Sequence, residues 1–221
     1  MTTTKPPGYL RLVIISDTHT DHHNISNLPE GDVLIHCGDF AKSRTNLNPA
    51  EYSDFAAWFV ARPHGTKILI SGTRDDYMHI EVIADRIKDS EEITKVQNYI
   101  LGQESINYLM DSSYVINRGM SRVNIWGSPW TQQYGERNVK KGFQLPACRP
   151  LKQKWEKIPT NTDILITHGP LYGVCDTDIK GSSSGCTELL KEVADRVQPV
   201  SYTHLRAHET SLHLVCRLLL E

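Results

Sequence analysis

Two residues that could bind a metal ion stand just after an apolar run near the start of the chain. Residues 10–15 are almost continuously apolar and predict a strand buried on both faces, as in a parallel sheet. Asp17 and His19 follow this run, two residues apart. In an extended backbone they would point to the same side, so that a carboxylate oxygen and an imidazole nitrogen could reach one cation. This donor pair suits zinc, manganese or iron, although a polar strand end without any metal gives the same pattern.

Three further apolar segments also end in polar residues. The segments are 32–36, 67–70 and 163–167, and the residues that follow them are Asp39, 73–75 and His168. Each residue alone is typical of an ordinary turn or loop, but the carboxyl ends of parallel strands meet at one edge of a sheet. We therefore predict a two-metal centre in which Asp39 bridges the ions. Asp17 and His19 would bind one ion and His168 the other, with the ions about 3.5–4 Å apart.

The order of the remaining elements predicts an α/β fold. Asn48 can cap a helix that starts at Pro49 and stops before Pro63. Further helices are predicted over residues 80–88, 91–101, 149–157 and 186–197, and a hairpin over 113–117 and 122–126. Because strands alternate with helices, the strands should pair in parallel through right-handed crossovers.

Composition narrows the class of protein. The 221 residues are enough for one domain with a substantial core, preceded here by a polar lead over residues 1–8. The net charge of −2 gives no basis for bulk electrostatic binding to nucleic acid or to a membrane surface. No apolar run approaches the ~20 residues that span a bilayer. The N-terminus lacks the apolar core of a signal peptide, and the five cysteines show no paired spacing, so we expect a cytoplasmic location.

The polar clusters together resemble the motifs of a known superfamily. Asp17-x-His19, Gly38-Asp39, Gly72-x-x-Asp75 and the run from Thr167 to Pro170 resemble the calcineurin-like metallophosphoesterases. The stretches SDTH, DVLIHCGDF, IWGSPWT, TDILITHGP and GCTELL resemble its subgroup of small metallophosphoesterase-domain proteins, over residues 9–199. The resemblance implies a four-layer α/β/β/α sandwich and two divalent ions, of manganese, iron, zinc or magnesium. It also implies hydrolysis of phosphodiesters or phosphomonoesters.

Two residues depart from the superfamily pattern. Where that pattern has Asn and His, this chain has Thr73 and Arg74. The short hydroxyl of Thr73 could reach a metal through a water, in place of the family's amide oxygen. Arg74 can stabilise phosphate charge, but it cannot act as an acid because arginine does not deprotonate in proteins.

Three more residues are candidates for contact with a small phosphoester or nucleotide substrate. His22 follows the first motif and could face the substrate, although an exposed position in a loop is the alternative. Trp130 and Tyr134 could form the wall of a nucleotide pocket, because aromatic rings stack on bases. Packing of a long loop against the sheet would use the same two residues.

The C-terminal stretch reads differently from the rest of the chain. Residues 200–221, beginning VSYTHLRAHET, resemble a translated sequencing adapter rather than a protein segment. We therefore expect the domain at 9–199 to be C-terminally truncated, without the superfamily's last strands and its G-x-H motif. The missing strand should leave an edge of the second sheet unpaired.

The predicted function depends on the metal ligands that the truncated domain keeps. We predict a metal-dependent phosphoesterase, in particular a phosphodiesterase that uses a metal-bound hydroxide. The missing ligands should leave this chain with one ion instead of two and with impaired activity. The alternative is a non-catalytic descendant that binds a metal, a phosphate or a nucleotide.

Overall fold

The computed structural model describes residues 9–42, 47–133, 142–147, 149–177, 181, 183–204 and 214–219. The strands are β1 (Tyr9–Ile15), β2 (Val33–His36), β3 (Thr66–Leu69), β4 (Ile106–Tyr108), β5 (Ser112–Arg118), β6 (Ser121–Ser128), β7 (Thr131–Gln132), β8 (Gln144–Leu145), β9 (Ile164–Thr167), β10 (Ser201–His204) and β11 (Leu214–Leu219). The α-helices are α1 (Pro49–Val60), α2 (Ile80–Arg86), α3 (Ser90–Leu101), α4 (Arg149–Trp155) and α5 (Thr187–Glu192). Short 3-10 helices η1 (Asp21–Asn24) and η2 (Asp76–Met78) and a π-helix, η3 (Val193–Val197), complete the described elements.

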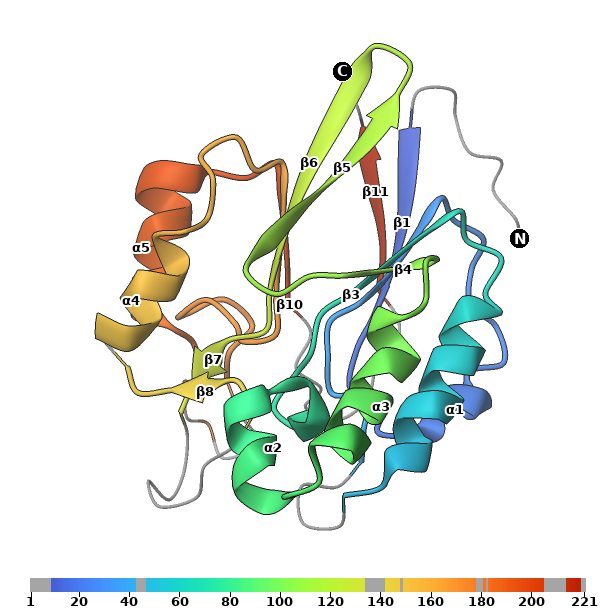
Figure 1. The fold of residues 1–221 in the computed structure, drawn as a ribbon. Helices are drawn as coiled ribbons and strands as arrows, with labels where there is room; N and C mark the ends of the chain where they lie inside the picture. Colours follow the sequence, from blue (N-terminus) through green and yellow to red (C-terminus); the bar gives the residue numbers. More distant parts are fainter. Residues whose placement is uncertain are drawn as a thin grey trace.

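Two sheets form the centre of the molecule. The first has the strand order β11-β1-β2-β3-β4, in which β1 to β4 run parallel and β11 pairs antiparallel with β1. The second has the order β10-β9-β6-β5, with β5 and β6 as the predicted antiparallel hairpin. Helices α1 and α3 cover the outer face of the first sheet, and α4 and α5 cover that of the second (Figure 1). The predicted four-layer α/β/β/α sandwich is therefore confirmed.

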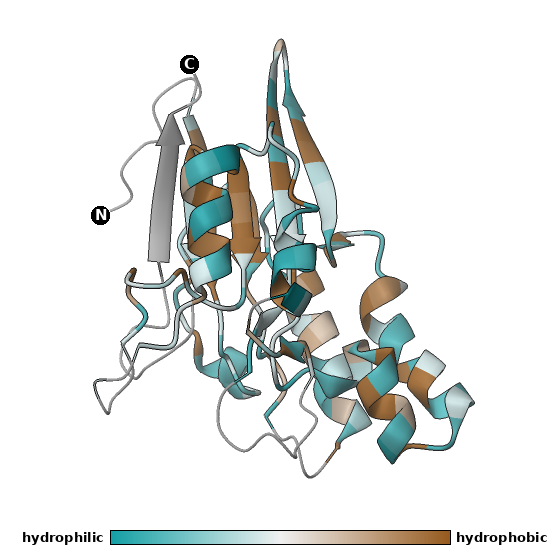
Figure 2. Cartoon of the chain, turned by 90° about the vertical axis from the view of Figure 1, so that its left-hand side faces the viewer, coloured by the Kyte–Doolittle hydropathy of each residue, from teal (hydrophilic) through white to brown (hydrophobic). Residues whose placement is uncertain are grey.

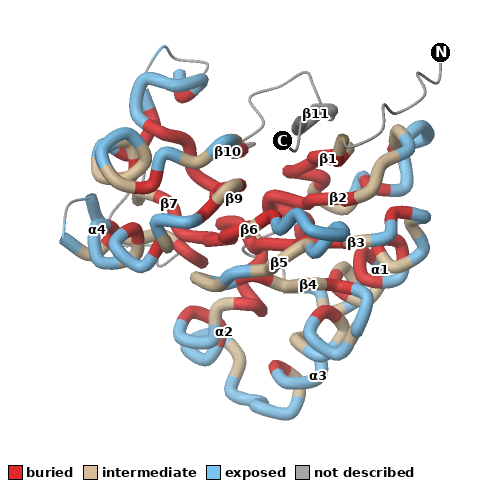
Figure 3. Tube along the Cα trace, turned by 90° about the horizontal axis from the view of Figure 1, so that it is seen from above, coloured by how far each residue is buried: buried red, intermediate tan, exposed pale blue. Residues whose placement is uncertain are grey.

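Alternating residues along the strands explain this layering. Leu10, Leu12 and Ile14 of β1 belong to a buried cluster that also contains Ile125 of β6 and Ile164 of β9, so this cluster fills the space between the sheets. Val13 and Ile15 of β1 pack instead with the helices of the outer layers. Apolar residues lie on the strands and, interspersed with polar ones, on the helices (Figure 2), and β1, β2 and β9 are largely buried at the centre of the molecule (Figure 3).

Helix α1 shows how the sequence specifies these elements. The side chain of Asn48 accepts a hydrogen bond from the backbone N–H of Ala50 at 3.1 Å, and Pro49 occupies the first turn, as predicted. Tyr52, Phe55 and Phe59 lie on one face of the helix and are buried. Among the described residues, no helix is both long enough and apolar enough to cross a membrane.

The C-terminal segment corrects one expectation. We expected the edge of the second sheet beyond β9 to be unpaired, but β10 pairs with β9 in parallel, from Ser201 beside Ile164 to His204 beside Thr167. The Tyr202 hydroxyl lies 2.9 Å from Thr167 Oγ1, which adds a side-chain contact to the backbone pairing. A backbone ladder needs no specific side chains, so a segment of unrelated origin can occupy a sheet edge. The origin of residues 200–221 stays a prediction.

Candidate metal centre

The candidate ligands come from loops at the carboxyl ends of β1, β2, β3 and β9. The loop after β1 is bonded to the loop after β2: the backbone N–H of Asp17 donates to the Gly38 carbonyl at 2.9 Å, and that of His19 donates to the Asp39 carbonyl at 3.1 Å. These bonds continue the pairing of β1 with β2 beyond the ends of the strands. They bring the first two motifs side by side.

Asp17, His19 and Asp39 form a compact group. One ligand atom from each lies within 4.8 Å of the others, and His19 Nε2 is 3.8 Å from Asp17 Oδ1. Both carboxylates are buried, whereas the His19 side chain is 31% exposed. A cation could therefore reach the group from the His19 side.

The backbone geometry that brings this group together differs from our expectation. Asp17 and His19 do not follow an extended strand; their φ values are 52° and 42°, in the left-handed region, and Asp39 has a φ of 58°. The side chains converge because the backbone turns sharply at these three residues. Aspartate tolerates this conformation better than most residues, but the apolar pattern before it gives no signal for it.

His168 approaches Asp39 from the second sheet. Its Nδ1 lies 2.8 Å from the Cys37 carbonyl oxygen, so this nitrogen carries the proton and donates it. Its Nε2 lies 3.5 Å from Asp39 Oδ1 and, among the described residues, is buried without a hydrogen-bond partner. A buried nitrogen lone pair beside a carboxylate is suited to bind a cation.

His19 has the same arrangement. Its Nδ1 lies 3.2 Å from the Ala41 carbonyl oxygen, so its Nε2 is the nitrogen that faces Asp17. Backbone carbonyls commonly fix the tautomer of metal-binding histidines in this way. Asp17, His19 and Asp39 offer one imidazole nitrogen and two carboxylates, a donor set that fits a divalent transition metal. Asp39 lies between this group and the Nε2 of His168.

Asp75 organises the loop beneath Asp39, a role that the sequence did not suggest. The Asp75 carboxylate accepts backbone hydrogen bonds from Asp39 at 2.8 Å, Gly72 at 2.7 Å and Ala41 at 3.0 Å. Burial and the nearby Asp39 charge raise the pKa of Asp75 well above its usual value, and the three donors oppose that rise. An aspartate three residues after a glycine is the pattern that could have indicated this turn.

Gly72 has to be a glycine. A Cβ at this position would overlap Asp39 Oδ1 and would lie 2.6 Å from His168 Cε1. The close approach of the backbone to two candidate ligands therefore leaves no room for a side chain.

Thr73 and Arg74 both contact Asp39. Thr73 Oγ1 lies 3.4 Å from each oxygen of the Asp39 carboxylate. The backbone N–H of Arg74 donates to Asp39 Oδ1 at 2.7 Å, and its Nε lies 3.8 Å from Oδ2. A second guanidinium nitrogen donates to the Lys42 carbonyl at 2.9 Å. The structure thus places a fixed positive charge beside the carboxylate that we predicted to bridge two ions.

His36, for which the sequence predicted no role, contacts the loops that follow β1 and β2. The ring accepts a hydrogen bond from the Gly38 backbone at Nδ1, 3.2 Å away, and lies 3.1 Å from Thr18 Oγ1 at Nε2. Burial lowers the pKa of His36 well below its usual value, so the ring is neutral and donates from Nε2. Its position at the end of an apolar strand could have indicated a structural histidine.

His22 and Trp130 lie apart from the group of ligands. His22 is fully buried, which rules out the alternative of an exposed loop residue, and its Nε2 faces Asp54 of α1 at 3.0 Å. The Trp130 indole N–H donates to Asp111 at 2.9 Å, and the Lys154 ammonium lies 3.8 Å from the centre of the Trp130 ring.

Trp130 also lines a cavity of about 240 Å³. The other lining residues are Met78, His79, Ile80, Glu81, Met110, Phe143 and Lys154. Tyr134, the second predicted wall residue, lies outside the described residues. Substrate contact by His22 or Trp130 stays a prediction.

Comparison with known proteins identifies relatives of the chain. The chain is 41% identical over 217 residues to human metallophosphoesterase domain-containing protein 1, covering 93% of this chain and 62% of that protein. A UPF0046 protein of Caenorhabditis elegans is 32% identical over 216 residues, which cover 90% of this chain and 69% of that protein. No protein-family model matches the chain.

A solved structure supports the fold. The phosphopantetheinyl hydrolase of Mycobacterium tuberculosis superposes with a TM-score of 0.55 at 14% identity, covering 90% of this chain and 83% of that one. At this identity the similarity concerns the fold alone. Together with the relatives and the four motifs, it shows that the chain belongs to the metallophosphoesterase family.

Proposed function

We propose that this chain is a phosphodiesterase that depends on one divalent cation. The main support is the convergence of Asp17, His19 and Asp39 within 4.8 Å, with the unpartnered Nε2 of His168 3.5 Å from Asp39. Membership in a metal-dependent phosphoesterase family supports the type of reaction. The preference for diesters, and for small phosphoesters or nucleotides as substrates, rests on the motif resemblance.

Each residue would have a distinct part in the reaction. Asp17 and Asp39 would supply negative charge for the cation, and His19 would bind it through Nε2. His168 Nε2 would face the other side of Asp39, where the family's second ion would lie. The bound cation would lower the pKa of a water molecule and neutralise phosphate charge. The Arg74 guanidinium, 39% exposed, can donate hydrogen bonds to a phosphate oxygen but cannot protonate a leaving group.

Replacing Asp39 tests the proposal. Asp39→Asn should lower manganese-dependent hydrolysis of bis(p-nitrophenyl) phosphate by about 100-fold, because it removes the anionic group that links the two halves of the centre. Asp195→Asn, at an exposed carboxylate on η3, is the control and should keep wild-type activity. If the wild-type chain turns over the diester no faster than Asp39→Asn, the proposed phosphodiesterase function is ruled out.

A second candidate function is supported by the contact between Arg74 and Asp39. The guanidinium at 3.8 Å supplies part of the positive charge that a second metal would otherwise supply. A chain of this kind could bind a metal and a phosphate without turnover. Equilibrium dialysis with manganese separates the two functions, because only a non-catalytic protein would bind the ion and show no hydrolysis.

Restoring the family residues at positions 73 and 74 tests whether the contact between Arg74 and Asp39 limits hydrolysis. The double variant Thr73→Asn, Arg74→His should hydrolyse the diester at least about tenfold faster, because histidine can act as a general acid and asparagine offers a carbonyl oxygen to a metal. Thr73→Asn, Arg74→Lys is the matched control; it keeps the charge of residue 74 but gains no acid that titrates near neutral pH. An unchanged rate in the double variant, with manganese bound, would show that these two positions do not limit activity.

A further inference from the structure

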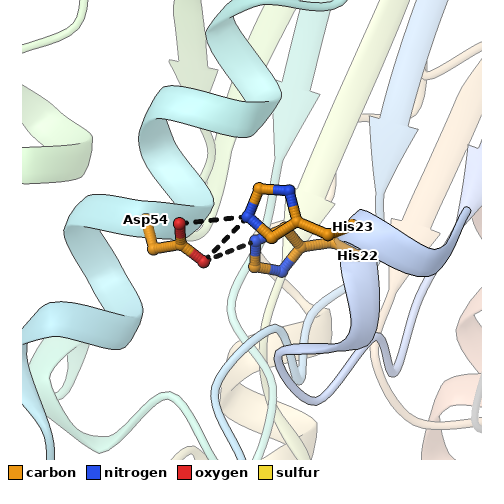
Figure 4. Close-up of side chains that lie close together, drawn as sticks. All are labelled: His22, His23 and Asp54. Atoms are coloured by element: carbon orange, nitrogen blue, oxygen red, sulfur yellow. Dashed lines mark hydrogen bonds and ion pairs between the residues drawn. The ribbon is translucent and has the colours of Figure 1, made fainter.

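A second group of metal-binding side chains lies on the outer side of the first sheet. His22 and His23 of η1 face Asp54 of α1, and Figure 4 shows both rings directed at the one carboxylate. One ligand atom from each residue lies within 4.8 Å of the others. The group shares no residue with Asp17, His19, Asp39 and His168.

The distances between the three side chains are close to those of a metal site. His22 Nε2 lies 3.0 Å from Asp54 Oδ2, and His23 Nε2 lies 3.0 Å from Oδ1 and 3.1 Å from Oδ2. Two ligands of a tetrahedral zinc ion, with bonds near 2.1 Å, are about 3.4 Å apart. A shift of a few tenths of an ångström would therefore give both histidine–aspartate pairs the spacing of zinc ligands, and the ligand atoms of all three residues already lie within 4.8 Å of one another.

The packing around His22 holds one ligand in place. Its ring centre lies 5.6 Å from that of Phe55, with the rings edge to face, and 5.1 Å from that of Trp58, and the side chain is fully buried. In contrast, the side chains of His23 and Asp54 are 60% and 53% exposed. The site thus has one ligand held rigidly by packing and one side open to solvent. Through the open side an ion can enter and a water molecule can complete the coordination.

The charges also suit a divalent cation. Burial is the main cause that lowers the pKa of His22, so this imidazole is neutral near pH 7. The hydrogen bond from His23 is the main cause that lowers the pKa of Asp54, so the carboxylate is ionised. Two imidazole nitrogens and one carboxylate oxygen are a donor set that zinc commonly binds.

From this geometry we propose that His22, His23 and Asp54 form a zinc site with three protein ligands, separate from the phosphoesterase centre. The bound ion would tie η1 to α1. Because η1 begins two residues after His19, the ion would also fix the loop that supplies Asp17 and His19. The site needs no phosphoesterase activity in order to exist.

Zinc stoichiometry tests this site. The full chain, freed of metal and then dialysed against micromolar zinc, should hold one more equivalent than either His23→Gln or Asp54→Asn, measured by elemental analysis. In titrations with a zinc indicator, each variant should lose at least about tenfold in affinity for that equivalent. Asp195→Asn should match the wild type, as a control for loss of an exposed carboxylate.

The phosphoesterase centre would bind zinc as well. A variant that lacks ligands of that centre therefore measures the second site alone. In Asp17→Asn, Asp39→Asn, with folding checked by circular dichroism, one equivalent should remain and should disappear when His23→Gln is added. Equal zinc content in the wild type, His23→Gln and Asp54→Asn would overturn the proposal. Because His23 and Asp54 are exposed, these single variants should fold, and the comparison does not depend on the background variant.

Discussion

Replacing Asp75 by alanine should lower the free energy of unfolding by about 3 kcal/mol or more. The variant would leave three buried backbone N–H groups, those of Asp39, Gly72 and Ala41, without their acceptor. Each unpaired buried donor costs about 1–3 kcal/mol. Urea denaturation followed by circular dichroism measures the change as a lower midpoint at unchanged slope.

Asp75→Asn is the matched control. It keeps the shape of the side chain and one acceptor oxygen, which can still serve the donors of Gly72 and Asp39 that share Oδ2. Its loss of stability should lie between those of the wild type and Asp75→Ala. If Asp75→Ala unfolds at the same urea concentration as the wild type, the carboxylate does not hold this loop.

Phe55→Ala should cost about 3–5 kcal/mol of the free energy of unfolding, the range typical of a buried phenylalanine. Phe55 is fully buried; its ring stacks on Phe40 at 4.3 Å and on Phe59 at 5.3 Å, and it meets the edge of His36 at 5.0 Å. The cavity would therefore open among residues that support the loop after β2. The midpoint of guanidinium unfolding measures the loss.

Phe55→Leu separates lost volume from lost aromatic contact. Leucine fills most of the space and should cost only about 1 kcal/mol. A loss from Phe55→Ala as small as that from Phe55→Leu would show that the surrounding rings close over the cavity.

The sequence was sufficient for the α/β architecture and for the meeting of the first two motifs. The apolar segments before Asp17 and Asp39 predict parallel strands that end at a common sheet edge. His168 reaches the same place from β9 of the second sheet, which that rule does not predict. The helix that begins at Pro49 could be predicted because its cap, proline and apolar face all agree. Some strand boundaries were displaced by one residue, as for β3, which runs over Thr66–Leu69 where the sequence predicts residues 67–70.

Other features depend on contacts that no local pattern encodes. The left-handed backbone at Asp17 and His19 arises from hydrogen bonds to a loop about twenty residues away. The burial of His22 arises from the approach of Phe55 and Trp58 on α1. The pairing of β10 depends on an available sheet edge, and nothing in its own residues predicts it.

The left-handed backbone at Asp17, His19 and Asp39 carries a cost in stability. At each of these positions glycine would suit the backbone better, by about 1 kcal/mol. The hydrogen bonds of these side chains must offset that cost, as where Asp39 accepts the Arg74 backbone N–H at 2.7 Å, so a glycine at residue 39 would relax the backbone and leave that donor unpaired.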